Sequence, residues 1–222
     1  MTRFTVFLGA AALALTTGAA SAATFDFTGP LFPLGGTNLG TDEVFNDVSN
    51  SYSVTATAIN TQQPPAPQVN QNGAGLGVNT GTFDINQLDN IFDDEALVFD
   101  FGRDAEMSSI TLSLASATDD YRIYGTNDGS VVNCTSGGVG CLTGVSSLLA
   151  SGQGVGIEGT VNVGLSGTYR YLIATTANGF FDVDGYRVAG LDVAPVPLPA
   201  AGWLMIAGLG GLAAARRRRA KA

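Results

Sequence analysis

The sequence predicts an all-β protein: an antiparallel β-sandwich or jelly-roll-like body, flanked by an N-terminal signal helix and a C-terminal transmembrane helix. Three observations carry the prediction for the body. Apolar and polar residues alternate along several short stretches, turn-forming Gly, Asn, Asp and Ser cluster between them, and no amphipathic helix of three turns or more is found in residues 24–195. Alternation with a period of two marks strands with one buried face, and many such short strands indicate a sandwich.

Residues 1–23 have the three parts of a secretory signal peptide. Arg3 gives a positive start, Phe4–Leu15 is an apolar run, and Ala20-Ser21-Ala22 has the small-residue register of a cleavage site. Cleavage after Ala22 or after Ala23 fits equally well. The alternative is an N-terminal helix of the core.

The body, residues 24–195, contains four clear alternating stretches, and two more lie at 181–184 and 186–193. The residues expected to face the core together are Tyr52, Val54, Ala56 and Ala58; Leu97, Phe99 and Phe101; Ile110, Leu112 and Leu114; and Tyr169, Tyr171 and Ile173, with Arg170 facing outward.

Two stretches do not alternate. Asn60–Gly81 is rich in Pro, Gln, Asn and Gly, and we expect a long surface loop because proline cannot donate to a β-ladder. A domain boundary is the alternative there, although the segment before it is too short to fold alone. Asp84–Glu95 has room for one or two helical turns before the strand at Leu97.

The body is strongly acidic. All 19 acidic residues lie between Asp26 and Asp192, where only four arginines oppose them, so the body carries a net charge of −15 against −9 for the whole chain. This charge excludes nucleic acid and anionic lipid surfaces as partners of the body and leaves divalent cations and neutral glycans.

Missing residue types exclude several catalytic classes. The chain has no histidine, which rules out Ser-His-Asp and Cys-His catalysis and histidine-type zinc sites. The only cysteines are Cys134 and Cys141, on either side of six residues. In an exported protein such a pair predicts one disulfide; two free thiols are the alternative.

The densest acidic segment is a candidate calcium site, with calcium as the one candidate cofactor. Calcium takes six to eight oxygen ligands, and a cation relieves the repulsion among crowded carboxylates. The segment lacks the EF-hand order, and a solvated acidic loop is the alternative; a second patch at Asp119, Asp120 and Asp128 reads more simply as turns. The candidate ligands are Asp84, Asp89, Asp93, Asp94 and Glu95.

The chain ends in a segment with three parts, residues 196–222. A proline-bracketed head is followed by sixteen uncharged residues and then by the cluster Arg216, Arg217, Arg218 and Arg219. A helix of that length covers roughly 24 Å, a little short of a typical ~30 Å hydrocarbon core. We expect a short membrane helix with the arginines kept on the cytoplasmic side.

This tail resembles the PEP-CTERM sorting signal of Gram-negative bacteria, most closely its VPLPA variety. The residues that carry the resemblance are Val196, Pro197, Leu198, Pro199 and Ala200. It implies that an exosortase, a membrane protease, is a partner that removes the tail. The protein would be transiently anchored in the inner membrane and then reach the cell surface or the extracellular space. It also implies an association with exopolysaccharide and biofilm matrix. An ordinary, uncut tail anchor is the alternative.

These observations favour an exported, non-catalytic cell-surface or matrix protein, with matrix polysaccharide as a candidate partner. Sugar binding would use exposed aromatic rings, for which Tyr121, Tyr124 and Tyr186 are candidates, although core packing suits each of them at least as well. The alternative function is a secreted glycan hydrolase that uses two carboxylates. No pair of the nineteen acids stands out for that role.

Overall fold

The structure is a computed structural model that describes residues 22–30, 35–60, 66–81, 84–89, 95–134, 139–155, 159–176 and 185–195. Residues 1–21 of the predicted signal segment, strand 181–184 and the C-terminal sorting segment lie outside these ranges, whereas Ala23, the last residue of the predicted signal segment, belongs to a strand. Within them, no helix is both long enough and apolar enough to cross a membrane.

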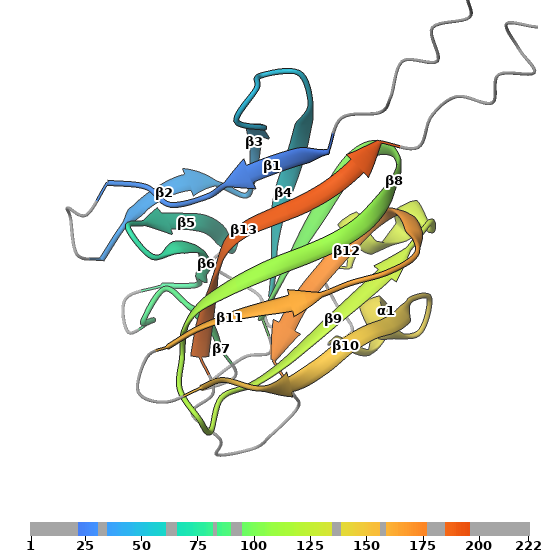
Figure 1. Cartoon of the computed structure of the whole chain (residues 1–222). Helices are drawn as coiled ribbons and strands as arrows, with labels where there is room; N and C mark the ends of the chain where they lie inside the picture. The colour runs from blue at the N-terminus through green and yellow to red at the C-terminus, as the bar shows by residue number, and fades with distance from the viewer. Residues whose placement is uncertain are drawn as a thin grey trace, which may run out of the picture. The chain divides into compact units, whose positions relative to one another are not determined.

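The described body is almost entirely antiparallel β-structure (Figure 1). Its elements are β1 Ala23–Asp26, β2 Thr37–Gly40, β3 Asp42–Asn46, β4 Ser53–Asn60, β5 Gln68–Asn72, β6 Gly75–Asn79, β7 Leu88–Asp89, β8 Glu95–Ala115, β9 Asp120–Thr126, the 3-10 helix η1 Gly129–Asn133, α1 Val139–Thr143, β10 Ser147–Gln153, β11 Gly159–Gly164, β12 Thr168–Thr176 and β13 Gly185–Pro195. The predicted all-β body is therefore confirmed.

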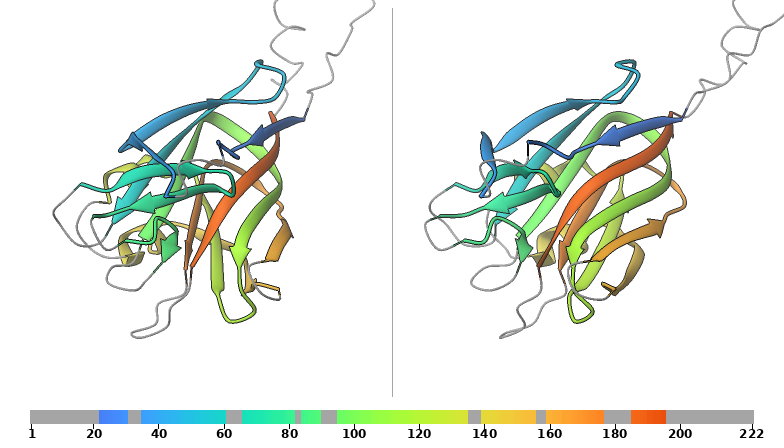
Figure 2. Two further views of the ribbon diagram at one scale, coloured as in Figure 1. Left: turned by 90° about the vertical axis from the view of Figure 1, so that its left-hand side faces the viewer. Right: turned by 60° about the vertical axis from the view of Figure 1, so that its left-hand side comes forward.

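Strand β8 joins the two halves of the fold. Its first half pairs with β4 on one side and β12 on the other, and its second half pairs with β13 and β11. The strand order is β10-β9-β12-β8-β13-β6-β5-β2, with β3 beside β4 and with β1 and β7 beside β13. The continuous sheet curls around its own inner face (Figure 2), so the two halves can share one core.

The inner core fills the space between these halves. Phe25 of β1 and Phe27 just after it pack on Phe99 and Phe101 of β8, with ring centroids 5.5 Å apart for Phe27–Phe99 and 6.4 Å for Phe25–Phe101. Three of the four predicted core faces belong to this inner core: the one that runs from Tyr52 along β4 to Ala58, and those of the first and second halves of β8. The exception is Leu114 of β8, which is not part of it. The alternation pattern thus located most of this core correctly.

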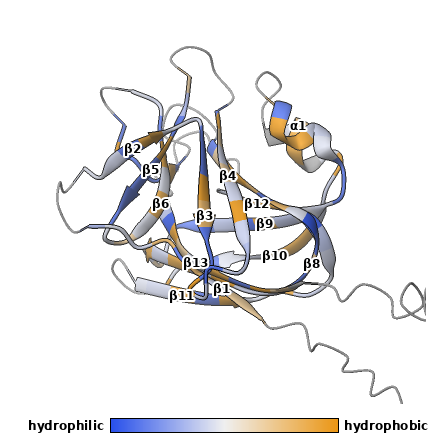
Figure 3. Cartoon of the chain, turned by 90° about the horizontal axis from the view of Figure 1, so that it is seen from above, coloured by the Kyte–Doolittle hydropathy of each residue, from blue (hydrophilic) through white to orange (hydrophobic). Residues whose placement is uncertain are grey.

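A smaller outer core lies on the other face of the sheet, near β9 and β12. Its members are Ile59, Ala96, Val98, Tyr124, Val131, Leu142, Tyr171 and Ile173. Seen from above, α1 lies beside β12 and β9 (Figure 3). Leu142 of α1 and Val131 of η1 pack on this face of the sheet as part of the outer core. Cys134 and Cys141 are bonded to each other and pack against this cluster. The predicted disulfide therefore links the two helices that cover the outer core.

Two of the predicted faces contain errors caused by bulges. Tyr171 and Ile173 belong to the outer core, whereas Tyr169 packs against the inner one, because the register between β12 and β8 shifts between Tyr169 and Tyr171. Leu114 has a positive φ of 56°, and the inner core continues with Ala115 instead. At Leu114 the extra residue lies in β8, and such a bulge reverses the faces beyond it; between Tyr169 and Tyr171 the shift is larger, since these residues pair with Ala105 and Asp100. The outward direction expected of Arg170 is confirmed, since it pairs with Asp100 at 2.9 Å and stays partly exposed.

The predicted loop at Asn60–Gly81 is wrong for its described part, residues 66–81. That part holds the hairpin of β5 and β6, whose Val69, Leu76 and Val78 are fully buried. Pro67 directly precedes β5, so the prolines bound the hairpin rather than prevent it. The helical turns expected at Asp84–Glu95 are absent from residues 84–89, which form a turn and the short strand β7.

Candidate metal centre

Three of the predicted calcium ligands come together at one end of the inner core. Asp84 lies in the turn after β6, Asp89 ends β7, and Glu95 begins β8. Strand β13 holds β7 in place by pairing Tyr186 with Leu88 and Gly185 with Asp89. The other two predicted ligands, Asp93 and Asp94, lie outside the described residues.

Asp84 is fixed by its own turn. Its Oδ2 accepts hydrogen bonds from the backbone N–H and the hydroxyl of Thr80, the latter at 2.8 Å, and its Oδ1 accepts one from the N–H of Asn86 at 2.6 Å. Asn86 has a positive φ of 59°, which asparagine tolerates better than most residues. These bonds hold the Asp84 carboxylate in place beside the other two acids.

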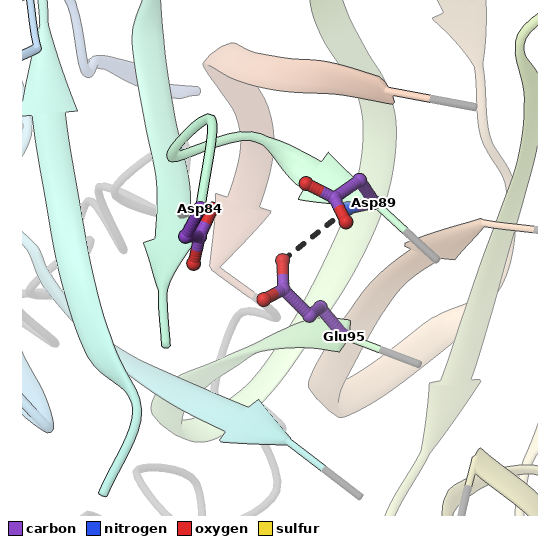
Figure 4. Close-up of side chains that lie close together, drawn as sticks. All are labelled: Asp84, Asp89 and Glu95. Carbon is purple, nitrogen blue, oxygen red and sulfur yellow. Dashed lines mark hydrogen bonds between the residues drawn. The ribbon is translucent and has the colours of Figure 1, made fainter. Parts of the chain in front are cut away.

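Asp89 and Glu95 bring their carboxylates into the protein interior. Asp89 is 6 % exposed and Glu95 only 2 %. The backbone N–H of Asp89 donates to Oε2 of Glu95 at 3.3 Å. One carboxylate oxygen from each of Asp84, Asp89 and Glu95 lies within 4.8 Å of the others (Figure 4). We call these three residues the carboxylate triad.

The triad is electrostatically unfavourable without a cation. Burial raises the pKa of Glu95 well above its usual 4.5, and the charges of Asp89 and Asp84 raise it further. The hydrogen bonds from Asp89 and Thr80 oppose this rise without cancelling it. Glu95 therefore keeps a proton to higher pH than an ordinary glutamate unless a cation takes the proton's place.

The geometry of the triad fits a calcium ion. Calcium–oxygen distances are about 2.3–2.6 Å, so two ligands on opposite sides of the ion are about 4.8 Å apart. Ligand atoms that all lie within 4.8 Å of one another can therefore share one such ion. Three carboxylates supply three to six of the six to eight oxygens that calcium takes. Among the residues that the structure describes, these are the only acids grouped closely enough to hold a metal.

Arg187 is a residue near the triad that the sequence patterns did not single out. It is almost fully buried, and its guanidinium donates to the backbone oxygens of Asn70 and Gly75 and to the side-chain oxygen of Asn70, at 3.0–3.3 Å. Burial lowers its pKa to about 10, and the nearby charge of Asp84 opposes that change. Arg187 thus ties β13 to the β5–β6 hairpin and adds one positive charge beside Asp84.

The second acidic patch does not form a site. Asp119 accepts from the N–H of Ser116, and Asp128 caps η1 by accepting from the N–H of Ser130. The hydrogen bonds from Ser130 lower the pKa of Asp128. These acids stabilise turns, which agrees with the simpler interpretation of the patch.

The three candidate tyrosines for sugar stacking are buried, which confirms the alternative of core packing for each of them. Tyr121 and Tyr186 belong to the inner core and Tyr124 to the outer core. The hydroxyl of Tyr186 donates to the backbone oxygen of Thr175 at 2.7 Å, deep in the structure. Within the described ranges, every aromatic side chain is buried or half-buried. These ranges therefore offer no exposed aromatic platform for a sugar.

No family model and no curated protein matches the chain. Solved structures give distant similarities. A family 32 carbohydrate-binding module of Clostridium perfringens NanJ, solved with galactose, has a TM-score of 0.35 and 16 % identity over 64 % of this chain and 93 % of the module. The module CpGH89CBM32-5 of the same organism, solved with GalNAc-β-1,3-galactose, has a TM-score of 0.35 and 11 % identity over 63 % of this chain and 94 % of that one.

A third similarity is to the C-terminal domain of a chitobiase from Bacteroides fragilis. It has a TM-score of 0.32 and 14 % identity, and it covers 46 % of this chain and 64 % of that domain. Scores and identities this low do not assign the chain to a family. The function is therefore argued from the residues of this chain.

Proposed function

We propose that this is an exported, non-catalytic protein of the cell surface or extracellular matrix, with a β-sandwich body stabilised by a calcium ion bound to the carboxylate triad. One observation carries the proposal: three carboxylates from three separate elements meet within 4.8 Å, and two of them are buried. Folding brings these negative charges together, and the attraction of each carboxylate to a bound divalent cation outweighs their mutual repulsion.

The expected stabilisation follows from binding linkage. An ion that binds only the folded chain adds about 2.7 kcal/mol at a hundredfold excess over its dissociation constant. For a chain of this size that corresponds to a rise in melting temperature of roughly 5–10 °C. The calcium concentration outside the cell would then decide how stable the body is.

The route to the surface rests on the two terminal segments. A signal peptide starts export, and the tail holds the protein in the inner membrane until an exosortase cuts near the Pro197-Leu198-Pro199 motif. The body fits between these segments, since β1 begins at Ala23 and β13 ends at Pro195, directly before the motif. The PEP-CTERM resemblance supports matrix polysaccharide as the partner at the surface.

The burial of the triad argues against these acids as the catalytic pair of a glycan hydrolase. A glycosidase must bring a glycosidic bond between two acids. Asp89 and Glu95 are almost closed to solvent, so a polysaccharide chain cannot reach both of them.

Thermal melting of the full chain in calcium and in chelator tests the proposal. We expect a higher melting temperature in calcium, and we expect the double variant Asp89→Asn/Glu95→Gln to abolish the difference. The matched control is Asp104→Asn/Glu106→Gln, which makes the same change at two exposed acids of β8 and should keep it. Coincident melts of the unaltered chain would show that the triad binds no calcium.

A further inference from the structure

The last strand of the sheet, β10, has an unusual composition for this protein. Among the strands that the structure describes, it pairs with β9 alone and ends the strand order. From Gly129 to Ile157 the sequence has no charged residue, although the body as a whole carries −15. Exposed edge strands normally carry charges or prolines that prevent pairing with another chain. β10 has neither.

On its outer side the backbone of β10 has hydrogen-bonding groups that pair with no strand in the described part of the chain. The N–H of Gly154 donates inward to the backbone oxygen of Asp119, and Gly152 lies opposite Tyr121 in the same register. Backbone groups of successive residues point to opposite sides of an antiparallel strand. The N–H and C=O groups of Ser151 and Gln153 therefore point away from β9, and both residues are exposed.

Apolar side chains are exposed along the same edge. Val145 is 42 %, Leu148 55 % and Val155 54 % exposed. The edge of β3 pairs with β4 alone among the described strands. It differs from β10 because it carries Asp42 and Glu43 beside its exposed Val44. An approaching acidic protein meets two carboxylates at the edge of β3 and none on β10.

We propose that two copies of this chain associate through their β10 strands, which pair antiparallel across a two-fold axis. The partner is a second copy because two strongly acidic bodies repel each other except where their surfaces are uncharged. An antiparallel strand can also pair with itself and satisfy both sets of backbone groups at once.

The register of this pair follows from the outward-pointing residues. The inner ladder of β10 shifts between Leu148 and Ala150 and is regular from Ala150 to Gln153. Centring the axis at Gly152 places Ser151 of each copy opposite Gln153 of the other. The exposed Leu148 and Val155 flank this contact and are covered by it.

Sedimentation velocity of the full chain over a range of concentrations tests the proposal. We expect a reversible dimer for the unaltered chain and at least a tenfold weaker one for Leu148→Lys and for Gln153→Lys, each with an unchanged melting temperature. The matched control is Val44→Lys, which places the same charge on the exposed edge of β3 and should leave the dimer intact. The C-terminal segment is common to all these chains, so differences among them report on β10.

Salt gives an independent readout. Screening weakens the repulsion between two acidic bodies and leaves backbone hydrogen bonds almost unaffected, so added sodium chloride should strengthen the dimer. A chain that stays monomeric at all concentrations would overturn the proposal. So would a dimer that Leu148→Lys and Gln153→Lys do not weaken, or one that Val44→Lys weakens equally.

Discussion

At the scale of single residues, Glu95 links the stability of the body to pH. Its pKa is raised in the folded chain, so without calcium the folded form keeps a proton that the unfolded form loses above pH 4.5. Stability therefore falls as the pH rises through the interval between these two pKa values. With calcium bound, the ion replaces the proton and the fall should disappear.

We predict that in chelator the chain melts at a lower temperature at pH 8 than at pH 5, and that Glu95→Gln removes most of this fall. The chain has no histidine, so an imidazole cannot produce the same pH dependence. Calorimetric melts at the two pH values measure the effect, with Glu106→Gln as the control that keeps it. An equal fall in Glu95→Gln would place its origin elsewhere.

Some residues of the candidate site could be identified from the sequence and others could not. Charge density alone identified Asp84, Asp89 and Glu95, because so many acids close together in sequence need an explanation. Arg187 gave no such signal. Arg187 lies between the buried Tyr186 and Val188, so alternation places its side chain on the other face of β13 and predicts that it is exposed. The β5–β6 hairpin covers that face instead. Long-range packing of this kind is not visible in a local pattern.

At the scale of elements, the β5–β6 hairpin depends on Gly75. Its φ is +128°, and an added Cβ would lie 2.4 Å from the backbone oxygen of Val188. We expect Gly75→Ala to lower the free energy of unfolding by about 2–4 kcal/mol, from backbone strain and overpacking.

Gly164 of β11 is the control for this variant, since nothing lies within 4 Å of an added Cβ there. Gly164→Ala should leave the free energy of unfolding nearly unchanged in urea denaturation. Similar values for the two variants would mean that the hairpin does not pack against Val188 as described.

The hairpin itself was predictable in part. Asn72-Gly73 is a turn-forming dipeptide; Asn72 ends β5, and the two residues between β5 and β6 are Gly73 and Ala74. The high content of Pro and Gln obscured it, because the prolines precede the strands and do not lie in them. The bulges at Leu114 and after Tyr169 had no comparable signal, since they arise from pairing between distant strands.

The disulfide belongs to the same scale. It links η1 and α1 through a sequence separation of seven residues and secures the cover of the outer core. We predict that Cys134→Ser/Cys141→Ser lowers the free energy of unfolding by about 2–3 kcal/mol without abolishing the fold. Urea denaturation measures this, and reduction of the unaltered chain should give the same loss. Full alkylation of both thiols in unreduced, denatured protein would contradict the bond.

At the scale of the whole molecule, the mature chain should begin and end close to the described body. Ala23 is the first residue of β1 and is buried against β13, so cleavage after Ala22 keeps the strand complete and is the one we expect. The C-terminus should lie between Val196 and Ala200. Intact-mass measurement of the protein from its host tests both ends. Recovery only of chains that still carry Arg216–Arg219 would contradict removal of the tail.

Calcium in the carboxylate triad would be visible by crystallography with anomalous scattering. Crystals of the full-length or processed chain grown with calcium should show an anomalous peak among Asp84, Asp89 and Glu95, at about 2.3–2.6 Å from an oxygen of each. Crystals grown with chelator should lack it. A well-ordered triad without a peak at millimolar calcium, or with its carboxylates turned away from one another, would contradict the claim.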